Sequence, residues 1–346
     1  MKKSVFSSFI KYIFSLTLIL FLILAAFAYW ALHTSLPKES YLDVNKRPNS
    51  EVRAYEGDIK IVSYNIGHAQ GIKQNAWDRK ELDTTSTHLE LLATAMKNMN
   101  ADIFLLQEVD IDSHRTQRIN QIEFLQEKLN FPYYACANMW EKNYVPFPYW
   151  PISDHIGYVR AANCVLSKYP LSNHHRIIFD KPSDNPFWYN WGYIDRGLQR
   201  VDVEINQQKI ALINIHLEAW GKHTREEQIK VVSDYIGNIK TPLVLGGDFN
   251  TVPTDAVKKN RFSDDDDDDY ENEETFSLLL QRNPNLKMES FDNNDKIYFS
   301  FPSDAPNRLL DHIFVKDLIY KDFSIQEQAN TASDHLPVMA NISLKD

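Results

Sequence analysis

The sequence predicts an α/β protein in which one layered domain follows a single N-terminal transmembrane helix. A long uncharged run lies within the first 32 residues, and short apolar strands alternate with amphipathic helices from residue 58 onward. Mixed strands and helices of this kind favour sheets in the interior and helices outside them. No segment of roughly 20–50 residues repeats itself, which argues against a solenoid. One domain over 58–346 is expected because no second linker interrupts it.

The N-terminal segment has the composition of a membrane anchor. Three lysines in residues 1–11 precede an uncharged run over 12–32, about 21 residues, which is long enough to cross a bilayer. The positive flank favours a cytoplasmic N-terminus and places the rest of the chain outside the cytoplasm. A cleavable signal peptide, with "AFA" at 26–28 as the cleavage site, would instead give a secreted protein. We favour the uncleaved anchor because the run is longer than a usual signal core.

Two polar segments interrupt the apolar pattern. Residues 33–57 contain proline and show no sustained period, so they are predicted to form a linker. Residues 264–274 hold nine acids and no base, and without them the formal net charge changes from -10 to -1. We expect a solvated loop held open by repulsion, with accessory calcium binding as the alternative. The nearly neutral remainder offers no basic stripe for tight binding of duplex nucleic acid.

The order of elements in the domain follows from the periodicity of the apolar residues. Strands are predicted at 59–66, 101–109, 132–139, 163–171, 198–205, 209–217, 243–247, 297–301, 309–315, 320–328 and 336–344. Helices are predicted at 87–99, 115–129, 223–239 and 274–282. In the first helix Leu89, Leu92 and Met96 share one face. In the third, Thr224 and Glu227 fit a capping box.

The chain has only two cysteines, Cys136 and Cys164, and both lie in strand-like segments. Two cysteines do not make a disulfide framework. A single bridge is allowed outside the cytoplasm, but both residues also fit as small core side chains. The sequence leaves both interpretations open.

Acidic and amide side chains stand at or near the ends of several apolar strands. They are Glu108, His216 with Glu218, Asp248 with Asn250, Asp311, and Asp334 with His335. Each alone could cap an element or form a turn, but acids in such settings need a cation, a histidine or an amide as partner. Five such placements in one chain point to a shared site. Their oxygen ligands suit a hard divalent cation such as Mg²⁺, Mn²⁺ or Ca²⁺.

Several other chemistries are excluded by missing motifs. The sequence has no cysteine cluster and no His-x-x-x-His helix, which argues against a zinc finger or a zincin. It has no Gly-rich phosphate loop before a Lys-Ser/Thr pair and no Gly-x-Ser-x-Gly elbow. Metal-assisted attack of water on a phosphate ester remains, with histidine and aspartate managing protons and charge.

Seven motifs occur in an order that resembles the endonuclease/exonuclease/phosphatase superfamily. They are "IVSYNI", "LLQEV", "NCVLSKYPL", "INIHLEAW", "LGGDFN", "RLLDHIFV" and "SDHLPVMA", and they span about 60–345. The superfamily includes deoxyribonuclease-type nucleases, abasic-site endonucleases, neutral sphingomyelinases and inositol-polyphosphate 5-phosphatases. The resemblance implies a four-layer α/β/β/α sandwich of two mixed β-sheets with the site at one edge.

The resemblance also implies roles for individual residues. Glu108 would be the principal metal ligand, with Asn65 beside it and Asp334 as a second metal or water contact, and the metal would be Mg²⁺, with Mn²⁺ or Ca²⁺ as alternatives. Asp248 would orient or deprotonate the attacking water, while Asn250 would hold a phosphate oxygen or the geometry of the site.

Two histidines and one further aspartate complete the set that the resemblance implies. His335 would contact the scissile phosphate, and Asp311 would fix its tautomer and favour its charged form. His216 would stabilise charge on the phosphate or the leaving group.

The basic contact to the phosphate has more than one candidate. Arg196 in "YIDRGLQR" lies near the position where some family nucleases place a phosphate-binding arginine, and Arg200 is its rival. Members that resemble abasic endonucleases carry a tyrosine seven residues before the serine of the "LS" strand, here Ser167. Arg160 stands at that position and is the second phosphate candidate. This departure puts an abasic-DNA role in doubt.

Aromatic clusters at 131–151 and 186–193 bear on the substrate. They fit core packing with rigid Pro-aromatic loops, a membrane-facing surface, or stacking of nucleobases. With the predicted tether and the near-neutral charge, we favour a membrane-anchored extracytoplasmic phosphodiesterase that acts on a phospholipid-type headgroup. The alternatives are an extracytoplasmic nuclease on DNA or RNA and an inactive binding module on the same fold. The partners implied are the membrane and a phosphate ester, and the sequence does not identify a protein partner.

Overall fold

The computed structural model describes residues 2–33, 41–47, 53–72, 84–265, 268–288, 295–327 and 332–345. Two parts of the expected linker, 34–40 and 48–52, and two residues of the acidic run, Asp266 and Asp267, lie outside the described residues. The helices are α1 (Lys2–Leu32), α2 (Thr84–Met99), α3 (Gln121–Leu129), α4 (Phe187–Gly192), α5 (Lys222–Gly237) and α6 (Thr275–Arg282).

Twelve strands form two sheets within the described part of the chain. They are β1 (Leu42–Lys46), β2 (Ile59–Asn65), β3 (Ile103–Asp110), β4 (Tyr133–Val145), β5 (Gly157–Ser167), β6 (Leu171–Ile178), β7 (Gly197–Ile205), β8 (Gln208–His216), β9 (Leu243–Asp248), β10 (Asp311–Lys316), β11 (Leu318–Ile325) and β12 (Val338–Leu344). One sheet has the order β1-β4-β5-β3-β2-β12-β11, and the other has the order β10-β9-β8-β7-β6. Both are mixed, because β2 pairs parallel to β3 and β8 parallel to β9, whereas the other pairs are antiparallel.

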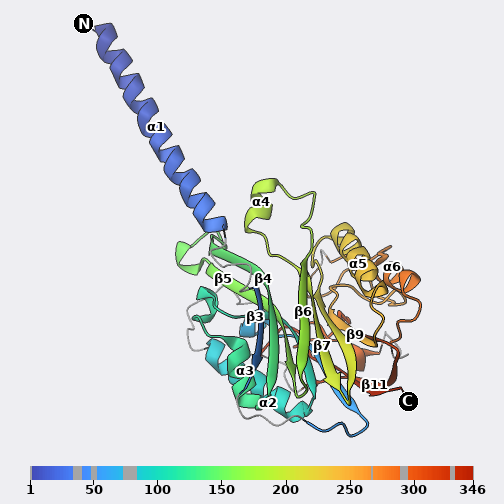
Figure 1. The fold of residues 1–346 in the computed structure, drawn as a ribbon. Helices are drawn as coiled ribbons and strands as arrows, with labels where there is room; N and C mark the ends of the chain where they lie inside the picture. Colours follow the sequence, from blue (N-terminus) through green and yellow to red (C-terminus); the bar gives the residue numbers. More distant parts are fainter. Residues whose placement is uncertain are drawn as a thin grey trace.

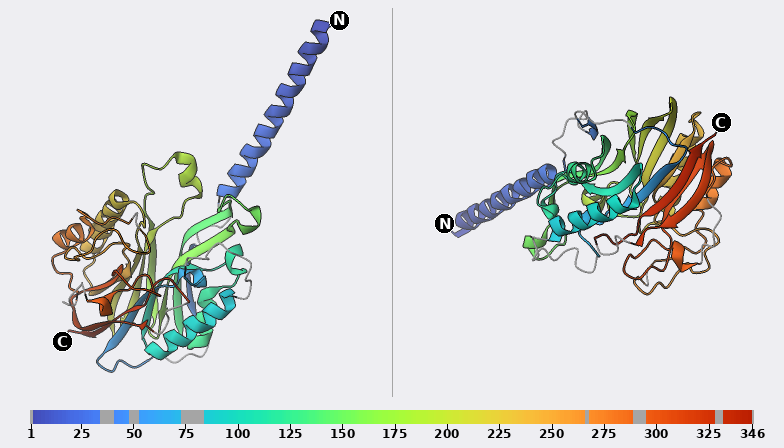
Figure 2. Two further views of the ribbon diagram at one scale, coloured as in Figure 1. Left: turned by 180° about the vertical axis from the view of Figure 1, so that it is seen from behind. Right: turned by 90° about the horizontal axis from the view of Figure 1, so that it is seen from below.

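The two sheets stack face to face with helices on both outer faces, as Figures 1 and 2 show, which confirms the predicted four-layer sandwich. Strand alternation builds this arrangement. In β2, Ile59 and Ile61 belong to the core between the sheets, while Val62 and Tyr64 pack on the outer side in a cluster that includes residues of α2 and α3. In the second sheet, Val244 faces the inner core and Leu245 joins the cluster of α5 and α6. Period-2 alternation therefore supplies two apolar faces per sheet.

The register of the second sheet aligns the polar ends of its strands. Asp311 of β10 lies opposite Asp248 of β9, and Asp248 lies opposite His216 of β8. Asp311, Asp248 and His216 lie an even number of residues from Ile313, Val244 and Leu212, respectively. The last three face the inner core, and alternation places the first three on the same face. Their side chains therefore point between the two sheets, at one edge of the sandwich.

Several elements differ from the prediction. Residues 42–46, inside the expected linker, form β1 and pair with β4. The predicted strand 297–301 is instead a 3₁₀ turn, Lys296–Tyr298, followed by an isolated bridge from Phe301 to Arg308. Helix α5 begins at Lys222 with Gly221 as its N-cap, and no side chain caps it, so the capping box at Thr224 is wrong. Local patterns do not reveal which backbone groups find partners elsewhere in the sheet.

The two cysteines form a disulfide. Cys136 of β4 and Cys164 of β5 lie directly opposite each other in the first sheet, with Cα atoms 4.2 Å apart. Both face the outer core of that sheet. The bridge therefore ties together the two strands that carry one wall of the pocket described below.

The described part of the acidic run is held by arginines. Arg308 is 2% exposed at its side chain and pairs with Asp264 at 2.9 Å and with Asp268 at 2.8 Å. Arg225 is equally buried and pairs with Glu273 at 2.7 Å. A buried guanidinium requires carboxylates around it, so the expectation of a purely solvated loop is wrong for these three acids.

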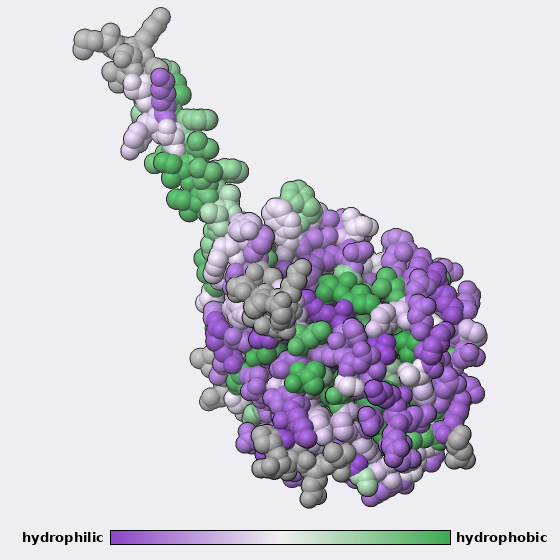
Figure 3. Space-filling view, viewed as in Figure 1, coloured by the Kyte–Doolittle hydropathy of each residue, from purple (hydrophilic) through white to green (hydrophobic). Residues whose placement is uncertain are grey.

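Helix α1 projects away from the sandwich (Figure 1), and hydrophobic side chains cover its half nearer to the domain (Figure 3). Its segment Ser8–Leu32 has a mean hydropathy of 2.4 and is the one helix among the described residues that is long and apolar enough to cross a membrane. Only its last turns contact the domain, where Asn143 of β4 donates to the backbone oxygen of Trp30 at 2.8 Å. A signal sequence passes the same test of length and composition.

Two adjacent glycines at the end of β9 give a test of how closely the strands approach. Gly247 has a φ of +148°, and a Cβ there would lie 2.0 Å from the backbone oxygen of Ile215. A Cβ on Gly246 would meet only the end of the Leu105 side chain, at 2.8 Å. Gly247→Ala is therefore expected to destabilise the protein by more than about 3 kcal/mol, and Gly246→Ala by about 1–2 kcal/mol.

Thermal unfolding of the two variants in one detergent, monitored by intrinsic fluorescence, checks which variant loses more stability. Backbone atoms cannot move aside as a leucine methyl can, so the larger loss belongs to Gly247. Equal shifts of the midpoint for the two variants would contradict the proposed origin of the strain.

Candidate active site

The site is organised around Asp248, whose carboxylate joins the two sheets. Asn65, at the end of β2, donates from Nδ2 to Asp248 Oδ2 at 2.9 Å. His216 Nε2 lies 3.3 Å from the same oxygen, and the backbone N–H of Asn250 donates to Oδ1 at 2.8 Å. Burial raises the pKa of Asp248, but His335, His216 and Asn65 lower it more, so the pKa lies below its usual range. The carboxylate is therefore ionised and fixed in orientation.

His335 and Asp311 form a hydrogen-bonded pair beside Asp248. Nδ1 of His335 lies 2.8 Å from Asp311 Oδ2, which also accepts from Ser300 Oγ at 2.7 Å. Nε2 of His335 points toward Asp248 Oδ2 at 3.6 Å. Burial lowers the pKa of His335, but Asp311 and Asp248 raise it more, to about 9. Burial raises the pKa of Asp311 to about 6, so between these values the pair is an ion pair.

Glu108 reaches the site through a break in the strand ladder. The register between β3 and β5 shifts between Leu106 and Val109, and Glu108 within this bulge has a φ of +55°. Its side chain thereby points to the edge of the sandwich, where Oε1 lies 3.5 Å from Arg196 Nη1 and 3.8 Å from His216 Nε2. A bulge re-aims a side chain that regular alternation would direct to the outer core.

A buried histidine that sequence reasoning missed lies behind Glu108. His68 Nε2 lies 3.1 Å from Glu108 Oε2, and its Nδ1 lies 3.3 Å from Asp110 Oδ1. Arg115 bonds both oxygens of Asp110 at 2.9 Å. Burial lowers the pKa of His68, but Asp110 and Glu108 raise it more. Two sequence features could have pointed to His68 and its partner Asp110. They are the motif "NIGHA" at the end of β2 and the second acid of "QEVD", two residues after Glu108.

Arg196 and His216 complete the pocket from the second sheet. Arg196 Nη1 lies 2.8 Å from His216 Nδ1 and also contacts Nε2. Burial and the neighbouring Arg196 lower the pKa of His216. The imidazole is therefore neutral, whereas the buried guanidinium keeps its charge.

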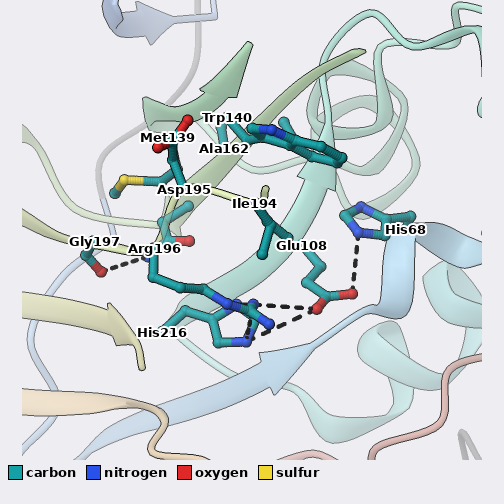
Figure 4. A pocket seen from close by; sticks show the side chains of 12 residues that line it. His68, Glu108, Met139, Trp140, Ala162, Ile194, Asp195, Arg196, Gly197 and His216 are labelled. Atoms are coloured by element: carbon teal, nitrogen blue, oxygen red, sulfur yellow. Dashed lines mark hydrogen bonds and ion pairs between the residues drawn. The ribbon is translucent and has the colours of Figure 1, made fainter. Parts of the chain in front are cut away.

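Figure 4 shows these side chains converging on one hollow. Glu108, His68, Arg196 and His216 line its floor, and Trp140 of β4 and Ile194 form the apolar wall. Asp195 and Gly197 bound the remaining side. The hollow thus combines one guanidinium, two carboxylates and two imidazoles with an apolar wall, a mixture that suits a phosphate ester.

The remaining predicted residues occupy different positions. Asn250 has a φ of +50°, and its Nδ2 donates to the backbone oxygen of Leu217 at 3.0 Å, so its amide holds the loop. Asp334 is buried, and its Oδ1 would lie 2.9 Å from a Cβ on Gly67, so the loop after β2 packs directly on it.

The three candidate arginines are separated by the structure. Arg196 lines the hollow. Arg160 bonds Asn138 Oδ1 at 3.2 Å and is not among the residues that line the hollow in the described part of the chain. Arg200 pairs with Asp202 at 2.9 Å. It shares a strand face with Leu198, which packs in the outer cluster of α5 and α6.

The donor set fits a hard divalent cation. Asp248, Asp311 and His335 each offer one ligand atom, and these atoms lie within 4.8 Å of one another. Oδ1 of Asp311 is buried and has no hydrogen-bond partner in the described structure. Glu108 adds a carboxylate from the first sheet at the same edge, whereas the amide oxygen of Asn65 accepts from the backbone N–H of Gly67 at 3.0 Å. An oxygen-rich, buried set of this kind suits Mg²⁺ or Mn²⁺.

The pKa of His335 predicts how stability changes with pH in the metal-free protein. Its value in the folded state, about 9, exceeds the value of about 6.5 expected in the unfolded chain. The stabilisation is therefore complete below pH 6.5 and is lost as the pH rises through about 9. We expect a loss of about 2–3 kcal/mol over this range in EDTA.

The double variant Asp311→Asn, His335→Gln is the matched control, because it keeps two polar side chains and removes both titrating groups. Its unfolding free energy should change less between pH 6.5 and 9.5 than that of the original protein. An imidazole resonance of His335 that titrates at or below pH 6.5 would contradict the assignment.

Comparison with known proteins agrees with this geometry. A structure described as an endonuclease/exonuclease/phosphatase from Beutenbergia cavernae has a TM-score of 0.61 at 19% identity, covering 84% of this chain and 72% of that one. A mannosyl-6-phosphatase of Bacteroides thetaiotaomicron has a TM-score of 0.55 at 16% identity, covering 83% and 100%. Truncated Caenorhabditis elegans TDP2 has a TM-score of 0.51 at 16% identity, covering 83% and 97%.

These likenesses concern the fold, and a comparison with curated proteins returned no significant match. The family model is more specific. It matches residues 62–335, which begin in β2 and end at His335 and so enclose every side chain of the site described above. The chain therefore belongs to the endonuclease/exonuclease/phosphatase family, whose members are hydrolases of the phosphatase and nuclease type.

Proposed function

We propose that this protein is a membrane-anchored, extracytoplasmic phosphodiesterase that depends on a divalent metal and hydrolyses a phospholipid-type headgroup. One observation carries the proposal. The fixed carboxylate of Asp248, bonded across the sheets by Asn65 and flanked by His216 and His335, lies beside a hollow lined by Arg196. The same edge receives the last turn of α1 through Asn143 of β4.

Each side chain has a defined part in the reaction. Asp248 accepts a hydrogen bond from the attacking water and takes its proton as the new P–O bond forms. The bond from phosphorus to the ester oxygen breaks, and the leaving oxygen takes up a proton from solvent water. His335 is protonated at neutral pH and donates from Nε2 to a phosphate oxygen, while Arg196 balances the charge of the phosphate.

Glu108 is proposed as the principal metal ligand, with Asn65 and Asp334 contributing from the same sheet. Asp311 is already committed to His335 and Ser300 through Oδ2, so we assign it a positioning role. A bound Mg²⁺ or Mn²⁺ would supply positive charge to the phosphate and the leaving oxygen.

Two features support the extracytoplasmic placement. The positive residues before the apolar run of α1 favour retention of the N-terminus in the cytoplasm. The disulfide between Cys136 and Cys164 suits an oxidising compartment. The resemblance of the fold to a mannosyl-6-phosphatase supports phosphate-ester hydrolysis in general.

The full chain in detergent, assayed with Mg²⁺ on bis-p-nitrophenyl phosphate, sphingomyelin and plasmid DNA, tests the proposal. We expect turnover of the first two substrates, and loss of that turnover in EDTA. Asp248→Ala and His335→Ala should each lower kcat by about 10²–10⁴-fold, because each removes a group that handles a proton or charge in the transition state.

The matched control is Asp112→Asn, which removes an exposed carboxylate paired with Arg118 at 2.9 Å. It should leave kcat unchanged. Full activity in EDTA, or full activity of Asp248→Ala, would overturn the mechanism. Rapid cleavage of DNA with no lipid turnover would replace the lipid substrate with nucleic acid.

His68 provides a separate test of the role of Glu108. Because Nε2 of His68 lies 3.1 Å from Glu108 Oε2, His68→Ala should release the carboxylate from its fixed position. We expect the Mg²⁺ concentration that gives half-maximal activity to rise about 10–100-fold, with a smaller change in kcat at saturating metal. An unchanged metal requirement would show that His68 does not position the ligand.

A further inference from the structure

We infer that a rim of aromatic side chains around the hollow is a bilayer-docking surface, so that the site opens onto the membrane that holds α1. The inference rests on the proposed function for its substrate, but it adds the surface by which the domain meets the lipid. The aromatic rim is defined by six exposed residues from three segments: Tyr149, Trp150, Phe187, Trp188, Trp191 and Trp220.

The rim is exposed far beyond what core packing requires. Trp150 is 78% exposed, Tyr149 is 70% exposed and Trp220 is 68% exposed. Helix α4 buries none of its residues, although four of its six residues are aromatic. Core packing was one explanation that the sequence allowed for these aromatic clusters. The exposure of the six side chains excludes that explanation for the rim.

The rings of the rim pack on one another rather than on the core. Phe187 lies 5.1 Å from both Trp188 and Trp191, measured between ring centroids. Tyr193, the residue after α4, lies 6.1 Å from Trp220 in the same way. The exposed rings of α4 therefore form one apolar patch, and such a patch marks an interaction surface.

The rim is built directly onto the walls of the hollow. Tyr193 Oη donates to Glu218 at 2.5 Å, which fixes the C-terminal end of α4 to the loop after β8. Ile194, Asp195 and Arg196 then follow in sequence and line the hollow. A substrate that enters the hollow from this side therefore passes the aromatic rings.

Contacts with α1 identify the bilayer as the occupant of the rim. Phe27 in the last turns of α1 lies 5.8 Å from Tyr144, measured between ring centroids. Tyr144 in turn contacts His155 Nδ1 at 2.6 Å, at the far side of the loop that carries Tyr149 and Trp150. The C-terminal end of the candidate span therefore sits against this loop, and Figure 1 shows α1 and α4 at the same end of the sandwich.

The chemistry of the rim fits the headgroup region rather than a polyanion. Tryptophan and tyrosine concentrate at membrane–water interfaces because one end of each ring is apolar and the other can hydrogen-bond. The nearby cations Lys142 and Lys181 both pair with Asp195, at 3.6 and 2.9 Å, so the entrance carries little net positive charge. A surface that binds nucleic acid would require unpaired basic residues.

The experiment uses the full chain in phosphatidylcholine nanodiscs. The variant Trp150→Ser, Trp188→Ser should lower the turnover of the bilayer lipid by at least about 10-fold, since docking becomes weaker. Turnover of water-soluble bis-p-nitrophenyl phosphate should stay within about twofold, because neither residue lines the hollow. Leu91→Ser is the matched control, since it removes an exposed apolar side chain from α2, which is remote from the rim, and it should leave both activities unchanged.

A depth measurement decides the inference independently of lipid turnover. The native cysteines are bridged, so Trp188→Cys and Leu91→Cys each accept one nitroxide label. The label at 188 should be more accessible to oxygen than to a water-soluble nickel chelate, and the label at 91 should show the reverse.

The possible outcomes separate the two proposals. A membrane-inserted label at 188 without lipid turnover would refute the substrate and keep the docking surface. A label at 188 as exposed to water as the label at 91 would overturn the docking surface, whatever the substrate is. Protection of residue 188 only where two chains share a nanodisc would assign the rim to self-association and would also overturn the inference.

Discussion

The bond from Asn65 Nδ2 to Asp248 Oδ2, at 2.9 Å, is the constraint on which the site depends. It joins the end of β2 in one sheet to the end of β9 in the other, across the inner core. Such a contact requires the two sheets to close tightly at this edge, and Gly246 supplies the space, because a Cβ there would lie 2.8 Å from Leu105 of the facing sheet. Asp248 keeps its charge in this buried position only because His335, His216 and Asn65 surround it. The same contacts therefore hold the two sheets together at this edge and keep the buried Asp248 carboxylate ionised.

Much of this arrangement could be predicted from the chain, because it follows from regular alternation. The sequence places Asp248, Asp311 and His216 on apolar strands and points to a shared site, and the register aligns all three in one row. The turn propensity of "GGDFN" is also satisfied, since Asn250 adopts a φ of +50°. The turn after β9 is therefore compatible with a functional role of the Asp248 carboxylate.

The parts that could not be predicted depend on irregular backbone or on distant partners. Glu108 enters the site through a bulge with a φ of +55°, which alternation does not encode. His68 is adjacent to Glu108 only because its loop folds back over β3, and its own φ is also +55°. The choice between Arg196 and Arg200 required the start of β7, because Arg196 lies just before Gly197, outside the strand, whereas Arg200 lies within it and faces the outer layer. Local sequence describes propensity, whereas such contacts are set by tertiary packing.

The charges of the site give a reason for a cation that does not depend on resemblance. Five buried carboxylates face four groups that can be positive, namely Glu108, Asp110, Asp248, Asp311 and Asp334 against Arg115, Arg196, His335 and His68. The pKa values of both cationic histidines are raised by these neighbours, so the edge carries about one net negative charge. A phosphodiester brings one more, and burying two uncompensated negative charges is costly. A divalent cation that enters with the phosphate would bring the site to neutrality, and this balance favours Mg²⁺ or Mn²⁺ over a monovalent ion.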